Sequence, residues 1–459
     1  MKEFYLKYKI PFFFSAILVA LYAAFAYDLE RYDFVKLLSL YAALFFLSYK
    51  LIQFQQGNFK FLLFVGILFR LVFLFALPNL SQDFYRFIWD GRLLAEGINP
   101  YLSFPQQYIS SENFNLFPQV GSLVEGMGSL SASNYTNYPP VSQLVYALAG
   151  IIAPKSIWGG VVVMRLVLIL ADVISLFFIQ KILRYLKLPA HRAFWYFLNP
   201  LVILELTGNL HFEGLIVAFL AASFWLLFQK KYVWAALLFG LSVSVKLLPL
   251  VLLPLFFYYF RKNNPLNLPK LILFYGIVGL TVLLSFVPFL SAEFFNHYAS
   301  SVGLWFSKFE FNASVYYIVR WLGFQTMGYN IIGIAGKILP LLVLVGVLLL
   351  SFLKRNTSEE NLLTSMLFAL SIYLLFATTI HPWYLITPIF LGVFTKFKYI
   401  FIWSFTVILS YFAYSNQGFE EHLWIVTLEY LIVFLFAFAE FFPTMKQRIV
   451  TQYKHYVYK

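Results

Sequence analysis

A short polar segment, residues 81–92, interrupts the long apolar stretches of this chain and carries much of its candidate chemistry. It holds two carboxylates, Asp83 and Asp90, and two guanidinium groups, Arg86 and Arg92. In a helix, the two aspartates would lie two turns apart and close to the same face. A carboxylate against an apolar wall, with its pKa tuned by a nearby cation, can accept a proton from a hydroxyl group. The segment therefore predicts general-base chemistry.

Further rare polar and aromatic side chains lie at the ends of later apolar stretches. These residues are His211, Glu213, Lys246, His381, Trp383 and Tyr384. Ionisable groups near a membrane usually mark function. The lysine and the two histidines, together with Arg86, are suited to hold a phosphate leaving group and to stabilise its developing charge. A base and a phosphate site are what transfer from a phosphate-linked donor to a hydroxyl requires.

The elements that must position these side chains are membrane-spanning helices. The chain has 459 residues, of which 61% are hydrophobic and 12% are charged. Apolar runs long enough to cross a bilayer recur throughout, and backbone groups in lipid must bond within their own segment, so we predict an all-α polytopic membrane protein with about 12–14 transmembrane helices. We place these spans near 10–26, 35–49, 61–78, 158–180, 193–208, 212–228, 232–247, 249–260, 271–289, 330–353, 362–379, 383–395, 397–414 and 423–442.

The distribution of charge predicts how the chain is oriented. The net charge is +13, and most of the 33 Lys and Arg residues fall in segments that share one side if the N-terminus is cytoplasmic. Positive-inside bias therefore explains the basic balance without any nucleic-acid partner. Both termini are then cytoplasmic, and the candidate site residues face the extracytoplasmic side of the cell membrane. Their common side predicts a single polar cavity.

Two long segments, 79–157 and 291–329, are predicted to be extracytoplasmic loops. The first ends in Tyr138-Pro139-Pro140, followed by an apolar stretch to Ile152 that is short and has polar flanks. We interpret that stretch as an interfacial or re-entrant helix rather than a full crossing. Short spans that contain Pro200, Pro249 or Pro254 predict broken helices that line a cavity.

Structural roles are alternatives for several of these residues. Asp83 is also suited to cap a helix that starts after Ser81, and Asp90 to form an ordinary turn beside Gly91. Arg86 would then simply pair with these acids. Lys246 could snorkel to the interface, and His381 could end a helix beside an aromatic belt.

Two features bear on the interior and on metals. Arg165 and Asp172 are seven residues apart within one span, and we expect them to form a structural pair inside the membrane. The chain has no cysteine, and Asp83 and Asp90 do not form a tight Asp-x-Asp motif. We therefore predict that the protein needs no cofactor and no divalent metal.

Four groups of short motifs lie in order along residues 60–395. They are Arg70 before Asp83-Phe-Tyr85 and Gly97-Ile-Asn99-Pro100-Tyr101; Tyr138-Pro139-Pro140; Asn199-Pro200 before Asn209-Leu-His211-Phe-Glu213; and Lys246-Leu-Leu-Pro249 with His381-Pro382-Trp383-Tyr384. This arrangement resembles the GT-C superfamily of lipid-phosphosugar-dependent glycosyltransferases, and most closely its bacterial mannosyltransferase-like members. The resemblance implies a general-base aspartate in the first outer loop, here Asp83, and a donor-phosphate site built from basic and histidine residues. The family often has Asp where this chain has Glu213.

The predictions from the sequence form one hypothesis. Residues 1–59 hold two extra transmembrane helices, 60–395 form a GT-C-like catalytic core, and 396–459 hold the last helices and a basic tail. The protein would move one hexose, such as mannose, from a polyprenyl-phosphate donor to a hydroxyl of a glycan, lipid or protein acceptor. Asp83 is the predicted base. The predicted substrate contacts are Arg86, Asp90, Tyr138, His211, Glu213, Lys246, His381, Trp383 and Tyr384.

Two other classes of function remain open from the sequence. A transporter or flippase of lipid-linked saccharides would also use many spans, broken helices and intramembrane charges. It should carry polar residues through to the inner face, whereas here they concentrate on one side. A non-enzymatic assembly protein would not depend on Asp83.

Overall fold

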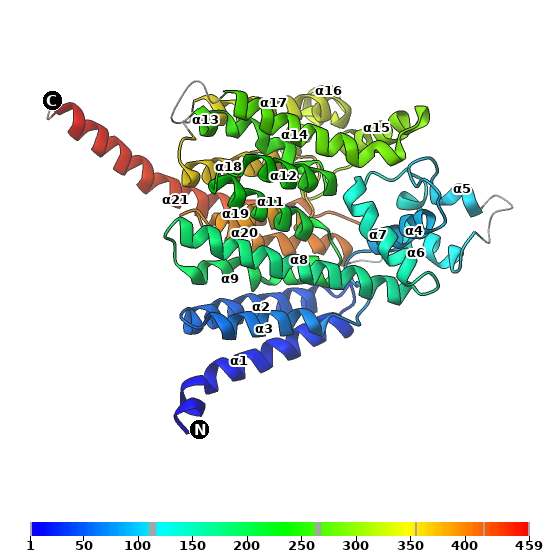
Figure 1. Cartoon of the computed structure of the whole chain (residues 1–459), viewed down its shortest axis with the longest axis horizontal. Coiled ribbons are helices and arrows are strands. Elements are labelled where there is room, and N and C mark those ends of the chain that lie inside the picture. Colours follow the sequence, from blue (N-terminus) through cyan, green and yellow to red (C-terminus); the bar gives the residue numbers. More distant parts are fainter. Residues whose placement is uncertain (1, 110–115, 262–267, 354–355, 416–417, 458–459) are drawn as a thin grey trace.

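A computed structural model describes residues 2–109, 116–261, 268–353, 356–415 and 418–457, without the side chains of 2–8, 305–307 and 443–457. The described part is helical almost throughout (Figure 1). Its extended pairing is limited to an isolated bridge between Phe311 and Thr379. The prediction of an all-α protein is therefore confirmed.

Seven helices in the described part are long and apolar enough to cross a membrane. They are α1 (Lys2–Tyr27), α2 (Phe34–Gln55), α8 (Ile157–Tyr185), α14 (Leu268–Phe286), α17 (Ile332–Phe352), α18 (Glu359–Phe376) and α21 (Leu423–Val457). The pair Pro200–Gly208 and Glu213–Phe228, bent by 116°, adds an eighth if it forms one span. The chain is thus a polytopic membrane protein, as predicted.

The other predicted spans correspond to shorter or interrupted helices. These include α3 (Phe59–Val72), α12 (Tyr232–Val245), η3 (Leu248–Leu255) with α13 (Phe256–Arg261), α19 (Ile386–Gly392) and α20 (Tyr399–Thr406) with η7 (Val407–Tyr414). Proline explains one of the breaks. Pro200 opens α10 (Pro200–Val202), and the Asn199 side chain accepts a hydrogen bond from the Leu201 amide at 2.9 Å. A π-helical turn, η2 (Ile203–Gly208), follows before α11 (Glu213–Phe228) begins. Such irregular backbone is tolerated at membrane depth where protein or a cavity surrounds it.

A buried ionic network ties the centre of the bundle together. Arg70 of α3 donates from Nε to Asp172 of α8 at 2.8 Å, and the Tyr196 hydroxyl donates to the same carboxylate at 3.0 Å. Both charged side chains are fully buried. A buried pair of this kind is tolerated only when further hydrogen bonds satisfy it.

The expected pairing of Arg165 with Asp172 is wrong. Asp172 pairs with Arg70, and in the described chain Arg165 forms no ion pair with it. Arg165 instead donates to the backbone carbonyl groups of Leu74, Ala76, Thr207 and Gly208. It thereby holds the end of η2 next to the turn that follows α3.

The segment 79–157 forms a helical cap at one end of the bundle, on the right of Figure 1. It contains α4 (Asp83–Ala95), α5 (Pro105–Ile109), α6 (Val120–Ala132) and α7 (Pro140–Ile152). The predicted helix that ends at Ile152 is therefore present as α7. Gly91 and Gly150 let α4 and α7 meet backbone to backbone, because a Cβ on either glycine would clash with a carbonyl group of the other helix. This contact fixes the second half of α4 against α7.

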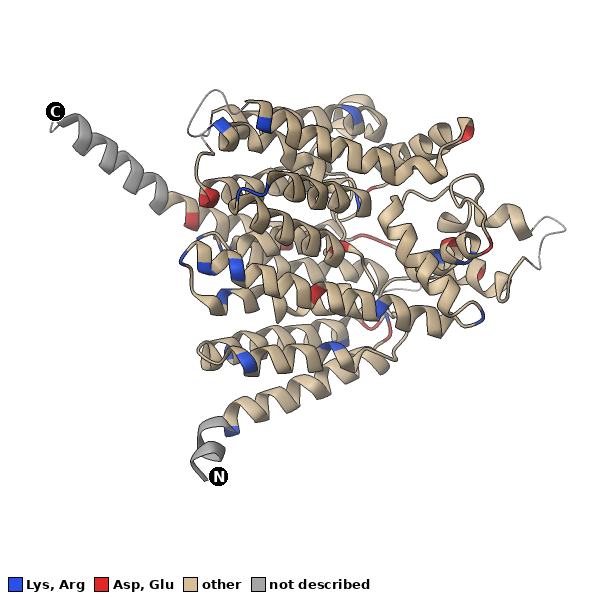
Figure 2. Cartoon of the chain, viewed as in Figure 1, with Lys and Arg blue, Asp and Glu red and all other residues tan. Residues whose placement is uncertain are grey.

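The two ends of the bundle differ in composition. The N and C labels of Figure 1 lie at the end opposite to α4, α5, α6 and α7. Many of the Lys and Arg residues gather toward that same end (Figure 2). Two further helices, α15 (Ala292–Ser307) and α16 (Val315–Met327), belong to the second long connecting segment.

Candidate active site

A polar cavity of about 510 Å³ lies where the helical cap meets the bundle. The starts of α4, α7 and α11, the end of α12 and the segment around η6 (Pro382–Leu385) all contribute to its wall. Eight of the ten predicted site residues line it. These residues are Asp83, Tyr138, His211, Glu213, Lys246, His381, Trp383 and Tyr384. The structure thus brings these eight side chains together around one cavity, whereas Arg86 and Asp90 do not line it.

Asp83 is the first residue of α4 and faces this cavity. Its amide donates to the Ser81 hydroxyl at 3.3 Å, and its side chain does not cap the helix. In the described chain, no side chain forms a hydrogen bond or ion pair with the Asp83 carboxylate. Burial raises the pKa of Asp83 to about 6, against attraction from Arg31 and Lys246 that lowers it, while Glu213 raises it. A carboxyl group with this pKa is largely ionised at neutral pH and can accept a proton.

Lys246 and Glu213 form an ion pair in the cavity wall. Lys246 follows α12 in an extended conformation, and Val245 before it accepts a hydrogen bond from the Ser142 hydroxyl of α7 at 3.0 Å. The Lys246 Nζ lies 2.5 Å from Glu213 Oε1 and 4.2 Å from the centroid of the Tyr384 ring. Lys246 is therefore held in direct contact with Glu213 and Tyr384.

Three rings stack along another side of the cavity. The His211 ring lies 3.6 Å from that of Trp383, and the Trp383 ring lies 4.3 Å from that of His381. The bridge to Phe311 holds this segment, because the Ile380 amide donates to the Phe311 carbonyl at 2.8 Å. Burial, with repulsion from Lys246 and Arg31, lowers the pKa of His381 to about 3. His381 is therefore neutral at physiological pH and can contact a substrate by hydrogen bonding but not by charge.

Behind His211 lies a buried glutamate that sequence reasoning missed. The Glu205 Oε2 is 3.5 Å from His211 Nε2, and its carboxylate accepts hydrogen bonds from Tyr411 at 2.8 Å and Asn209 at 3.1 Å. Glu205 is fully buried within η2. An acid inside the predicted span 193–208 was the available signal, since intramembrane acids are rare.

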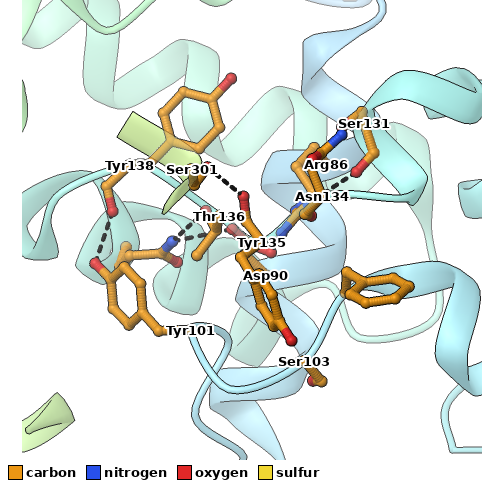
Figure 3. A network of polar contacts seen from close by, with 12 residues as sticks. Arg86, Asp90, Tyr101, Ser103, Ser131, Asn134, Tyr135, Thr136, Tyr138 and Ser301 are labelled. Atoms are coloured by element: carbon orange, nitrogen blue, oxygen red, sulfur yellow. Dashed lines mark hydrogen bonds and ion pairs between the residues drawn. The ribbon is translucent and has the colours of Figure 1, made fainter. Parts of the chain in front are cut away.

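Arg86 and Asp90 lie outside the cavity lining and pair with each other (Figure 3). Arg86 Nε donates to Asp90 Oδ1 at 2.8 Å, while its NH1 group donates to the carbonyl groups of Ser131 and Asn134. These contacts, with a hydrogen bond of 2.6 Å from the Tyr101 hydroxyl to the Tyr138 carbonyl, hold residues 131–138 in place. Arg86 and Asp90 therefore position the segment that carries Tyr138. This geometry supports the alternative in which Arg86 pairs with an acid as a structural contact, and it does not support the predicted substrate contacts of Arg86 and Asp90.

Other lining residues were also missed by sequence reasoning. Arg31, from the loop between α1 and α2, and Glu310 both line the cavity. Glu310 is paired with Arg320 at 2.5 Å. The signal for Arg31 was the run of ionisable residues in loop 28–33 between two predicted spans, which places it on the same side as Asp83. In the part of the chain that the structure describes, no cluster of three or more His, Asp or Glu side chains is arranged to hold a metal ion.

Fold and site together define a polytopic helical membrane protein in which broken helices and a helical cap enclose a polar cavity that Asp83 lines. Residues 34–261 match the family described as alpha-(1->6)-mannopyranosyltransferase, N-terminal domain. These residues include Asp83 and Lys246, whereas Arg31 and His381 lie outside the match. The match covers just under half of the chain, and it confirms the resemblance to bacterial GT-C mannosyltransferases.

Individual relatives agree with the family match. The chain is 22% identical over 337 residues to alpha-(1->6)-mannopyranosyltransferase A of Mycobacterium tuberculosis, covering 69% of this chain and 61% of that protein. It is 28% identical over 144 residues to alpha-(1->6)-mannopyranosyltransferase B of Corynebacterium glutamicum, covering 31% and 23%. It is also 23% identical over 182 residues to alpha-(1->6)-mannopyranosyltransferase A of Corynebacterium glutamicum, covering 39% and 35%. The chain thus spans about three fifths of the length of the first of these relatives.

Proposed function

We propose that this protein is an integral-membrane glycosyltransferase that transfers a single mannose from a polyprenyl-phosphate donor to an acceptor hydroxyl of a glycan, lipid or protein. The observation that carries the proposal is the Asp83 carboxylate, which has no ionic partner among the described residues and lines the polar cavity. Asp83 and several other lining residues lie within the range that matches the family. The relatives supply the sugar, since each is named as a mannopyranosyltransferase.

An apolar groove beside the polar cavity supports a lipid-linked donor. The groove has a volume of about 280 Å³ and lies between η3, α17 and α18. It shares Tyr373, Thr379 and Tyr384 with the polar cavity. A polyprenyl chain bound there would bury apolar surface, while its phosphate and sugar reach the polar groups.

The reaction that we propose is a single displacement. The acceptor oxygen forms a bond to the anomeric carbon as the bond from that carbon to the phosphate oxygen breaks. Asp83 accepts the acceptor proton, and the phosphate leaves with the electron pair, its charge stabilised by cationic side chains. Among the described carboxylates that line the cavity, Glu213 and Glu310 are ion-paired and Asp83 is not. One base without a second nucleophile favours inversion at the anomeric carbon.

The orientation that we propose puts the active site on the extracytoplasmic side of the cytoplasmic membrane. Many of the basic residues gather toward the end of the bundle where the termini lie (Figure 2), and such residues favour the cytoplasmic side. The cavity lies at the end formed by the helical cap. Both termini are then cytoplasmic.

The alternative function is that of a transporter or flippase of lipid-linked saccharides. The bent pair Pro200–Gly208 and Glu213–Phe228 favours it, because broken helices of this kind also build transport sites. The two functions differ in what happens to the sugar, since only an enzyme moves it to a new hydroxyl group.

The test supplies purified protein with radiolabelled polyprenyl-phosphate mannose and candidate acceptors. Asp83→Asn should reduce transfer at least about 100-fold, because it removes the general base. The matched control is Asp28→Asn, whose carboxylate is exposed and, within the described residues, is paired with Lys36 alone. Undiminished transfer by Asp83→Asn would remove the catalytic assignment. No transfer with any acceptor, together with lipid-linked sugar crossing the bilayer of vesicles, would establish the alternative.

A further inference from the structure

Arg31 lines the polar cavity although it comes from the loop between the two N-terminal helices. Resting on the function proposed above, we propose that Arg31 binds the phosphate group of the polyprenyl donor and of the polyprenyl-phosphate product. The first two helices would then be part of the active site, because they present this side chain. Residue 31 also lies before the part of the chain that matches the mannopyranosyltransferase family.

The loop that carries Arg31 is held at both ends. The Asn79 side chain donates to the carbonyl groups of Phe25 at 2.7 Å and Leu29 at 3.0 Å, which fixes the end of α1 against the start of the helical cap. On the other side, Asp33 caps α2 by accepting from the amide of Lys36 at 3.1 Å, and the Phe34 ring lies 4.9 Å from that of Phe412. Arg31 is therefore presented by an ordered turn.

The guanidinium group of Arg31 is oriented by an aromatic ring. Its central carbon lies 3.5 Å from the centroid of the Tyr414 ring, which also lines the cavity. Its Nε atom is buried and has no hydrogen-bond partner in the described chain. Stacking on an aromatic face leaves the N–H groups at the edge of the guanidinium plane available to an anion. An unsatisfied buried donor is costly, and an oxyanion ligand would satisfy it.

The other candidate cations are already neutralised. Lys246 is paired with Glu213 at 2.5 Å, and Arg86 is paired with Asp90 at 2.8 Å away from the cavity. Within the described residues, no carboxylate lies within ion-pair distance of Arg31. Arg31 thus brings positive charge into the cavity without a fixed counter-ion. A phosphate matches it, because a guanidinium group can donate two parallel hydrogen bonds to phosphate oxygens.

The position of Arg31 also couples phosphate binding to the base. Attraction from Arg31 lowers the pKa of Asp83, so the two groups act on each other across the same cavity. A phosphate on Arg31 would cancel part of that attraction. Asp83 would then bind a proton more tightly when the donor is in place, at the point in the cycle where a base is needed.

The experiment measures binding to the full-length purified protein in detergent of two probes of equal chain length, a polyprenyl monophosphate and the corresponding polyprenol. Wild type should bind the phosphate form more tightly. Arg31→Gln should weaken binding of the monophosphate roughly tenfold or more and leave the polyprenol unchanged. Arg31→Lys should fall between them, because an ammonium keeps the charge but lacks the planar fork. The control is Lys50→Gln, which removes a cation of α2 that lies outside loop 28–33 and does not line the cavity, and which should bind both probes as wild type does.

The outcomes separate this inference from the function on which it rests. If wild type prefers the monophosphate and Arg31→Gln keeps that preference, the assignment of Arg31 is wrong and the proposed donor stands. If Arg31→Gln loses both probes equally, Arg31 supports the fold and does not read phosphate, so the inference is again overturned. If wild type binds both probes alike, the proposed donor itself fails. If Arg31→Gln unfolds, Arg31→Lys provides the test because it keeps the positive charge. Weaker binding of the monophosphate with unchanged binding of the polyprenol would support the inference, and wild-type binding of both probes would overturn it.

Discussion

Lys246, which follows α12, places its Nζ 2.5 Å from Glu213 Oε1 at the start of α11. This contact divides the charged groups of the cavity into two kinds. Lys246 and Glu213 neutralise each other, whereas Asp83 lacks a fixed ionic partner among the described residues. Ionisable groups with perturbed proton affinity and no partner are the ones that catalysis can use. The pair itself tunes Asp83, and that tuning can be measured.

The first prediction concerns the pH dependence of transfer. Because the pKa of Asp83 is raised to about 6, kcat/KM should rise with pH up to that value and level off above it. Below it, the rate should fall about tenfold per pH unit as the base becomes protonated. A profile measured with wild type that stays flat between about pH 5 and pH 7 would contradict the assignment of Asp83 as the base.

The same pKa predicts the stability of Asp83→Asn. The fold raises the pKa of Asp83 from its ordinary value of 3.8 to about 6, so the folded state loses stability as the pH rises between these values, and the full penalty is present above pH 6. Asparagine removes that penalty. The melting temperature of Asp83→Asn at neutral pH should therefore equal or exceed that of wild type, which separates loss of the base from loss of the fold.

The second prediction is that substitutions of Lys246 and Glu213 shift the pKa of Asp83 in opposite directions. Lys246 lowers the pKa of Asp83 and Glu213 raises it. Lys246→Gln should therefore move the acid limb of the pH profile to higher pH, and Glu213→Gln should move it to lower pH. The measurement is kcat/KM against pH for both variants beside wild type. Shifts in the same direction would show that the pair does not act on Asp83 electrostatically.

Much of the fold followed from apolar runs and from the side on which basic residues fall, because both reflect the bilayer directly. The same reasoning grouped His211, Lys246 and His381 with Asp83, and the structure brings these side chains together around one cavity. Helical spacing was less informative about Asp90. Asp90 lies two turns after Asp83 in α4 and packs against α7, where it binds Arg86 and Gln143. The periodicity of one helix does not show which neighbouring element packs against each of its turns.

Arg31 and Asp172 show why pairing across the bundle could not be predicted. Asp172 takes its partner, Arg70, from a helix about a hundred residues away. Arg31 reaches the cavity because η7 supplies Tyr414 beneath it. Both contacts depend on how helices far apart in sequence are placed against one another, and local pattern does not contain that information.

The third prediction concerns the buried pair of Arg70 and Asp172. Asp172→Asn leaves a guanidinium group without its counter-ion in the interior, which should cost about 3–5 kcal/mol of folding free energy. The measurement is thermal unfolding in detergent. The control, Asp28→Asn, breaks a largely exposed pair with Lys36 and should cost less than about 1 kcal/mol. Equal losses of folding free energy in the two variants would show that burial does not determine how much the Arg70–Asp172 pair stabilises the protein.

The fourth prediction concerns divalent metals. The proposed displacement uses Asp83 for the proton and cationic side chains for the phosphate, so it needs no metal ion to stabilise charge. Transfer should therefore be unchanged by excess EDTA and by later addition of Mg²⁺ or Mn²⁺. Activity that disappears with EDTA and returns with one of these ions would overturn the prediction.

The fifth prediction concerns Glu205 as a positioning residue for His211. Glu205 Oε2 lies 3.5 Å from His211 Nε2, which forms no hydrogen bond in the described chain, so the carboxylate acts on the ring by its charge and favours the orientation that stacks on Trp383. Glu205→Gln should lower kcat about tenfold with a smaller change in donor KM, because the ring is misplaced in the transition state more than in the ground state. Steady-state kinetics on purified protein separate the two parameters.

Coupling between the two positions distinguishes this role from a general loss of stability. If Glu205 acts through His211, then Glu205→Gln should have little further effect in a protein that already carries His211→Ala. The matched control is Glu429→Gln, since Glu429 is also fully buried and accepts hydrogen bonds from Trp403 and Asn312 but does not line the cavity. Its effect on kcat should add to that of His211→Ala. Additive effects for Glu205→Gln as well would reduce Glu205 to a purely structural residue of the π-helical turn.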